Sequence, residues 1–124
     1  MEKKIPWWQP HIEKEDYRFI KSALDNNYIN EGPLVVQFED AIKKLLGVKY
    51  AVATNSCTVA IFLALKAAGV KRGDEVIVPD ITFIATASAV DLLGATPVLV
   101  DIDPDTLTMD PEAVTRAISK KTRA

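Results

Sequence analysis

A short polar segment between two apolar runs contains the residues best suited to bind an anion. Five residues form it: Thr54, Asn55, Ser56, Cys57 and Thr58. If a strand precedes this segment and a helix follows it, the first N–H groups of the helix have no intrahelical partner and carry the positive end of the helix dipole. Such amides, with hydroxyl groups beside them, bind phosphate. The pattern predicts a phosphate site; the alternative is that Thr54, Asn55 or Ser56 only caps the helix.

Two common nucleotide-binding motifs are absent from the sequence. There is no GxGxxG, so the dinucleotide fingerprint is missing, and there is no GxxxxGK[ST], so a P-loop is missing as well. A phosphate at residues 54–58 would therefore belong to another kind of ligand.

Phe83 follows Thr82 at a second predicted junction between a strand and a helix. An aromatic ring at this position can stack on a flat cofactor held at the end of the neighbouring strand. The alternative is a core phenylalanine that packs the helix onto the sheet.

Acidic and thiol side chains are weaker candidates for chemistry. Asp101, Asp103 and Asp105 resemble a metal loop, but an EF-hand needs glycine at its sixth position, where Thr106 stands here. A turn rich in Asp and Pro is favoured instead, and no metal site is predicted. The only histidine, His11, lies far from Cys57 in the sequence, so we expect Cys57 to be a small buried thiol and not a nucleophile.

The elements that must position these residues alternate between short apolar runs and helical patterns. Strands are predicted at residues 50–54, 75–79 and 97–101, and helices at residues 13–26, 33–46, 59–68, 83–93 and 111–119. The fold class is therefore α/β, a βαβαβα unit preceded by two helices, with a parallel sheet covered on both faces. Ligands of such sheets bind beyond the carboxyl ends of the strands. We expect an N-terminal extension with two helices at residues 1–47 and the βαβ core at residues 48–124.

Composition limits the classes of partner. A net charge of −2 over 124 residues gives no electrostatic reason to expect nucleic acid or an anionic membrane as partner. No apolar run reaches about 18 residues, so no membrane span is predicted. The single cysteine fits a reducing cytoplasm. Two prolines make residues 5–10 extended, with Trp7 and Trp8 packed under the domain or against a partner subunit.

Long stretches of the sequence resemble the DegT/DnrJ/EryC1/StrS aminotransferases, the pyridoxal-phosphate-dependent sugar aminotransferases of the aspartate aminotransferase-like fold. The resemblance includes YINEGPLVVQFEDAIKKLLGVKYAVATNSCTVAIFLALKAAGV, then GDEVIVPDITFIATASAVDLLGATPVLVDID, and finally DTLTMDPEAVTRAISKKTRA. It implies that the chain is an incomplete N-terminal part, residues 1–124, of the large cofactor-binding domain.

The resemblance also implies roles for individual residues. The turn that binds the cofactor phosphate in the family is here Ser56, Cys57 and Thr58, with Cys57 where a smaller residue is usual. The family's T-aromatic-x-A-T stretch is here residues 82–86, so Phe83 would stack on the pyridine ring. Asn30, Gly32 and Thr82 would lie at the mouth of the substrate site, near a dimer interface.

The whole enzyme that the resemblance implies transfers an amino group, typically from glutamate, to a nucleotide-linked keto-sugar, as in polysaccharide biosynthesis. It would be a cytoplasmic homodimer. Family members are much longer than this chain, and the Schiff-base lysine and the carboxylate that pairs with the pyridine nitrogen lie in the part not present here. No catalytic residue is therefore assigned, and the chain alone is expected to be inactive.

Other interpretations remain open. The first is a non-catalytic sensor or regulatory module, because some relatives of the family have that role. The second is a plain α/β interaction domain whose exposed sheet edge requires a partner chain. The third is a sugar dehydratase of the same family, which shares the N-terminal half and differs at the position of the lysine.

Overall fold

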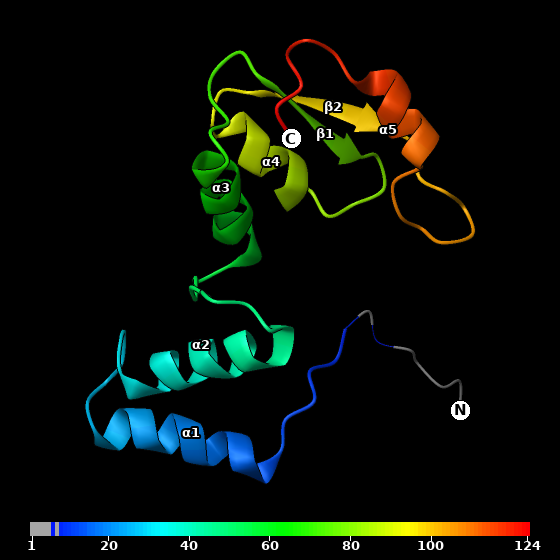
Figure 1. Ribbon diagram of the computed structural model, residues 1–124. Coiled ribbons are helices and arrows are strands. Elements are labelled where there is room, and N and C mark those ends of the chain that lie inside the picture. Colours follow the sequence, from blue (N-terminus) through cyan, green and yellow to red (C-terminus); the bar gives the residue numbers. More distant parts are fainter. Residues whose placement is uncertain (1–5, 7) are drawn as a thin grey trace, which may run out of the picture. The chain divides into compact units, whose positions relative to one another are not determined.

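The computed structural model describes residue 6 and residues 8–124, and it divides the chain into two compact units, residues 1–53 and 54–124. The elements in chain order are α1 (Lys14–Asp25), α2 (Pro33–Leu46), α3 (Cys57–Ala67), β1 (Glu75–Pro79), α4 (Ala85–Asp91), β2 (Thr96–Val100) and α5 (Pro111–Ala117) (Figure 1). The predicted α/β class is confirmed. The boundary between the units lies six residues after residue 47, where the sequence suggested one.

The first unit contains helices α1 and α2. A capping box starts α1, because the side chains of Glu13 and Asp16 each accept a hydrogen bond from the backbone N–H of the other residue. Pro33 is the first residue of α2, and Gly47 ends it in the left-handed conformation (φ 65°). Both helices lie within about one residue of their predicted bounds. Neither has a buried residue, so their apolar side chains remain accessible.

The loop between α1 and α2 contains a close contact. A Cβ atom added to Gly32 would lie 2.7 Å from both Cβ and Cγ of Tyr28. The backbone of Gly32 is extended (φ 177°), which any residue adopts. Glycine is therefore needed here because Tyr28 occupies the space, and not because of an unusual backbone conformation.

Two expectations concern the ends of this unit. Trp8 is largely exposed, so the described part of the chain does not pack it under a domain; Trp7 lies outside the described residues. The predicted strand at residues 50–54 is wrong for this structure. Tyr50 and Val52 are 75% and 79% exposed. A strand exists only where its backbone groups pair with a neighbour, and no strand pairs with this segment among the described residues.

The second unit is built on a small parallel sheet. Strands β1 and β2 pair in register from Glu75 opposite Thr96 to Pro79 opposite Val100, and α4 connects them. The other edge of β1 contacts the end of the chain: Glu75 N–H donates to the carbonyl of Lys121 (2.9 Å), and Ile77 N–H donates to that of Ala124 (2.9 Å). Residues 121–124 therefore lie beside β1, on the edge opposite β2.

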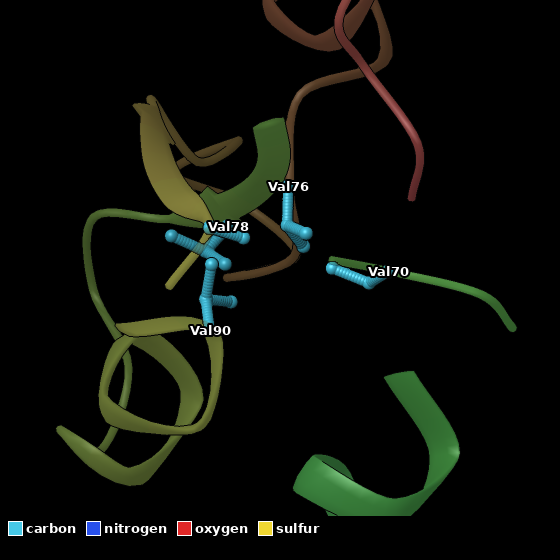
Figure 2. Close-up of a cluster of buried hydrophobic side chains, with 5 residues drawn as sticks. Val70, Val76, Val78 and Val90 are labelled. Carbon is cyan, nitrogen blue, oxygen red and sulfur yellow. The ribbon is translucent and has the colours of Figure 1, made fainter. Parts of the chain in front are cut away.

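The core of this unit lies between the sheet, α4 and the segment after α3. It is a cluster of five small apolar side chains, Val70, Val76, Val78, Val90 and Ala95, of which the four valines are labelled in Figure 2. Val76 and Val78 alternate with less buried residues along β1, as expected for a strand with one face in the core. The sheet and α4 thus form the packed base of the unit.

Helix α3 lies beside α4 in the same unit. Its sequence is apolar almost all round, which predicted burial, but α3 has no buried residue in the structure. Val59 and Leu63, one turn apart, are both exposed. The prediction of a buried helix is wrong for the described residues, because α4 covers only one side of α3. No helix in the described part of the chain is long and apolar enough to cross a membrane.

Candidate functional site

The N-terminus of α3 is organised by hydroxyl groups. Ser56 is the N-cap residue, with extended backbone, and its Oγ accepts a hydrogen bond from the N–H of Val59 (3.3 Å). Thr54 Oγ1 donates to the carbonyl oxygen of Ser56 (3.0 Å). Ser56 therefore caps the helix, as the simpler interpretation expected. The cap and a phosphate site are compatible, because the cap uses only one of the amides in the first turn.

Two N–H groups of this turn remain available. No residue in the described part of the chain accepts a hydrogen bond from the N–H of Cys57 or that of Thr58. Both groups lie at the positive end of an 11-residue helix. Ser56 and Cys57 are exposed, and Thr58 is half-buried. The turn thus presents two amides and a hydroxyl to solvent, the donors that a phosphate group requires.

The environment of Cys57 differs from the expectation. The thiol is exposed, so the prediction of a buried cysteine is wrong. The reason is its place as the first residue of α3, at the open end of the helix rather than on the side that faces α4. Its side chain therefore borders the amides that would bind an anion.

Phe83 is not a core residue. Its side chain is 79% exposed, two residues before the start of α4, whereas Ala85, Ala89 and Val90 of that helix are buried. The interpretation of Phe83 as a core phenylalanine is therefore wrong. Its ring is free to contact a ligand, as stacking requires. Convergence of Phe83 with Ser56 and Thr58 on one pocket stays a prediction, and the cavity of about 250 Å³ beside Thr58 is lined by Val59, Phe62 and Leu92.

The acidic segment after β2 forms a turn. Asp103 Oδ1 accepts hydrogen bonds from the N–H groups of Asp105 (2.8 Å) and Thr106 (3.0 Å). The Thr106 amide, followed by the Asp105 amide, lowers the pKa of Asp103 below its ordinary value. The turn interpretation is confirmed. Within the described residues, no three side chains of His, Cys, Asp or Glu gather in a way that could hold a metal ion.

The residues expected at the substrate mouth fall in different units. Asn30 and Gly32 line a cavity of about 220 Å³ in the first unit, together with Tyr28 and Gln37. Among the residues that the structure describes, no charged side chain lines this cavity. Thr82 belongs to the second unit, where its Oγ1 lies 3.0 Å from that of Thr86.

Sequence reasoning missed two polar contacts near these segments. Glu39 Oε1 accepts a hydrogen bond from the N–H of Ala53 (2.8 Å), 14 residues further along the chain. No local sequence pattern predicts a contact between residues this far apart. The contact between Thr82 and Thr86 is local, since four residues separate them, but Thr82 lies three residues before α4. Helical spacing alone therefore did not predict it.

Comparisons with known proteins agree with the fold. A model of the DegT/DnrJ/EryC1/StrS aminotransferase family matches residues 10–124. The spore coat polysaccharide biosynthesis protein SpsC of Bacillus subtilis is 44% identical over 120 residues, which are 97% of this chain and 31% of SpsC. The chain thus spans about a third of the length of this curated relative.

Two solved structures extend the comparison. One is the PLP form of Spr1654 from Streptococcus pneumoniae, described as a sugar aminotransferase, with 36% identity, a TM-score of 0.88, and coverage of 97% of this chain and 31% of the other. The second is the GDP-4-keto-6-deoxy-D-mannose-3-dehydratase of E. coli, with 31% identity, a TM-score of 0.84, and coverage of 96% and 32%. From the family match over residues 10–124, this chain belongs to the DegT/DnrJ/EryC1/StrS aminotransferase family.

Proposed function

We propose that this chain is the cofactor-binding part of a pyridoxal-phosphate-dependent aminotransferase that transfers an amino group, from glutamate, to a nucleotide-linked keto-sugar. The family match and the similarity to a sugar aminotransferase in its PLP form support the proposal. As in the relatives, the chain would be one part of a longer protein.

The observation that carries the proposal is the donor set at the start of α3. Ser56 supplies a hydroxyl, and Cys57 and Thr58 supply two N–H groups with no partner among the described residues. A phosphate monoester carries about two negative charges and accepts several hydrogen bonds, so this donor set fits it. These residues would hold the cofactor by its phosphate and fix one end of the ring system.

Phe83 would supply the second contact. An exposed aromatic ring at the carboxyl edge of β1 can cover one face of a flat pyridine ring and exclude water from it. When bound, pyridoxal phosphate supplies an electron sink for the reacting carbon of the substrate. The residues of this chain would bind and orient the cofactor, and the residues that move protons would come from the rest of the protein.

We propose Asn30 and Gly32, in the first unit, as substrate-mouth residues, and we propose Thr82, in the second unit, as a separate polar contact for the substrate. The cavity beside Asn30 and Gly32 has amide, hydroxyl and apolar groups and, among the described residues, no charged side chain. Uncharged hydrogen-bonding groups of this kind suit the hydroxyl groups of a sugar. We also propose a homodimer, because the apolar faces of α1, α2 and α3 remain exposed in the single chain. We place it in the cytoplasm because a single cysteine fits a reducing compartment.

A sugar dehydratase is the second candidate. The specific observation that favours it is the similarity to the E. coli GDP-4-keto-6-deoxy-D-mannose-3-dehydratase, which covers 96% of this chain. The aminotransferase is preferred because the family match and the 36% identical relative both carry that activity in their descriptions. Reading the coding sequence after Ala124 separates the two: a lysine at the family's cofactor position supports the aminotransferase, and another residue there supports the dehydratase.

Titration of the chain with pyridoxal phosphate tests the proposal. We expect saturable binding that Ser56→Asp and Phe83→Leu weaken. The matched controls are Ser22→Asp in α1 and Phe38→Leu in α2, which make the same changes at exposed residues of the first unit. Equal affinity for wild type, Ser56→Asp and Phe83→Leu would contradict the proposed site.

A further inference from the structure

We infer that Thr86 is a positioning residue for Phe83, acting through a clamp of two hydroxyl groups, those of Thr82 and Thr86, that spans the aromatic residue. This inference rests on the proposed function for the role of the ring, whereas the clamp itself is a structural feature that can be tested without any cofactor.

The first observation is the contact between the two hydroxyl groups. Thr82 Oγ1 and Thr86 Oγ1 lie 3.0 Å apart, at hydrogen-bond distance. Thr82 precedes Phe83 directly, and Thr86 follows it by three residues. The bond therefore closes a loop of backbone that contains Phe83 and restricts the direction in which its Cα–Cβ bond points.

The second observation is a backbone bond at the same place. The N–H of Thr86 donates to the carbonyl oxygen of Phe83 (3.1 Å). Thr86 thus holds this loop twice, through its hydroxyl group to Thr82 and through its amide to Phe83. The next backbone bond, from Ser88 N–H to the carbonyl of Ile84 (3.0 Å), continues into α4.

Burial shows why such a clamp matters at Phe83. Ala89 and Val90 are 0% exposed, so packing against the core fixes the body of α4. In contrast, the side chains of Ile81, Phe83 and Ile84 are all largely exposed. Packing within the described residues does not hold the ring of Phe83, and hydrogen bonds are the restraint that remains. The clamp links the backbone at Phe83 to Thr86, which belongs to the packed helix α4, and so restrains the backbone of the aromatic residue.

The consequence for the proposed site is preorganisation. A ring whose backbone is already ordered loses less conformational freedom when a flat ligand stacks on it. Thr82 then contributes through its bond to Thr86. Its hydroxyl group is engaged inside the clamp, in addition to its proposed contact with the substrate.

The first test uses the chain without cofactor. Thr86→Val removes the hydroxyl group and keeps the shape of the side chain, while Thr86→Ser keeps a hydroxyl group. The control is Thr115→Val in α5, which removes a hydroxyl group bonded to the carbonyl of Pro111 (2.8 Å), away from Phe83. Amide hydrogen exchange, corrected for intrinsic rates, measures how strongly the backbone N–H groups of this loop are protected from solvent.

We expect Thr86→Val to lower the protection of the residue 86 amide by roughly two- to tenfold, the range that one net hydrogen bond gives. Thr86→Ser and Thr115→Val should keep it within experimental error. Equal protection in Thr86→Val and wild type would overturn the clamp, whether or not the chain binds any cofactor.

The second test uses pyridoxal phosphate as probe. The free cofactor is achiral, so circular dichroism in its absorption band reports a fixed orientation in the protein. We expect the signal per bound cofactor to fall in Thr86→Val and to be retained in Thr86→Ser. An unchanged signal in Thr86→Val would overturn the positioning role. Unchanged cofactor affinity in Phe83→Leu would instead contradict the proposed stacking. Failure of the positioning role and failure of the proposed function therefore give different results.

Discussion

The hydroxyl oxygen of Ser56 accepts a hydrogen bond from the N–H of Val59 at 3.3 Å, which closes the first turn of α3. The bond is long for an N–H···O contact. The same hydroxyl group can rotate toward a phosphate oxygen and donate to it, while the Cys57 and Thr58 amides donate from the same turn. The helix cap and the proposed phosphate site therefore share the Ser56 hydroxyl group, as acceptor from Val59 N–H in the cap and as donor to the phosphate.

Substitution of Ser56 separates these two uses. Asp is as good an N-cap residue as Ser, so Ser56→Asp should leave the free energy of unfolding within about 0.5 kcal/mol of wild type. Its carboxylate should repel the phosphate and weaken cofactor binding. Ser56→Ala should cost about 1 kcal/mol of stability. Urea unfolding and cofactor titration measure the two effects, and strong binding by Ser56→Asp would count against a phosphate at this turn.

Gly32→Ala should destabilise the loop between α1 and α2. The new Cβ would lie 2.7 Å from both Cβ and Cγ of Tyr28, and the Tyr28 Cβ cannot move away without a shift of the backbone. We expect a loss of about 1–3 kcal/mol, as for overpacked sites. Thermal unfolding of Gly32→Ala, Tyr28→Gly and the double variant measures the coupling, because Tyr28→Gly removes both contacting atoms. If Gly32→Ala costs the same with and without the Tyr28 side chain, the contact is not the cause.

The turn at Asp103 predicts a pH dependence of stability. The Thr106 and Asp105 amides lower the folded-state pKa of Asp103 below the unfolded value of 3.8. The ionised carboxylate therefore stabilises the fold above the unfolded pKa, and this contribution disappears as the pH falls through the folded pKa. Asp103→Asn should narrow the difference in urea midpoint between pH 7 and about pH 3. Asp105→Asn is the matched control, and an equal effect of both variants would contradict this assignment.

Local signals in the sequence explain most of the elements. Strand β1 has its predicted bounds because three β-branched residues stand between a turn and a proline. Helix α5 begins where predicted, since Asp110 Oδ1 accepts from Glu112 N–H (2.9 Å) and Pro111 follows the cap. These signals act within a few residues of the chain, so they set the bounds of an element without contacts to distant residues.

The predictions that were wrong depend on contacts between residues far apart in the sequence. Residues 50–54 have the pattern of a strand, but a strand also needs a partner, which no local pattern supplies. Cys57 is a residue type that is usually buried, yet its place at the end of α3 exposes it. At the candidate site, the donor turn at Ser56 could be predicted from residue types, whereas the exposure of Phe83 depends on how α4 packs on the sheet.

Cys57→Pro tests the central claim, that the amides of this turn bind phosphate, most directly. Proline is well tolerated at the first position of a helix, and the extended backbone of Ser56 is the conformation that a following proline requires. The variant therefore removes one N–H donor and keeps the helix. Cys57→Ala removes the thiol, keeps the N–H, and is the control.

The measurement is the affinity of wild type and both variants for pyridoxal phosphate. A hydrogen bond to a charged group contributes about 1.5–3 kcal/mol, so Cys57→Pro should bind about ten- to a hundredfold more weakly. Cys57→Ala should bind like wild type or slightly better. Equal affinity for wild type, Cys57→Pro and Cys57→Ala would contradict the account.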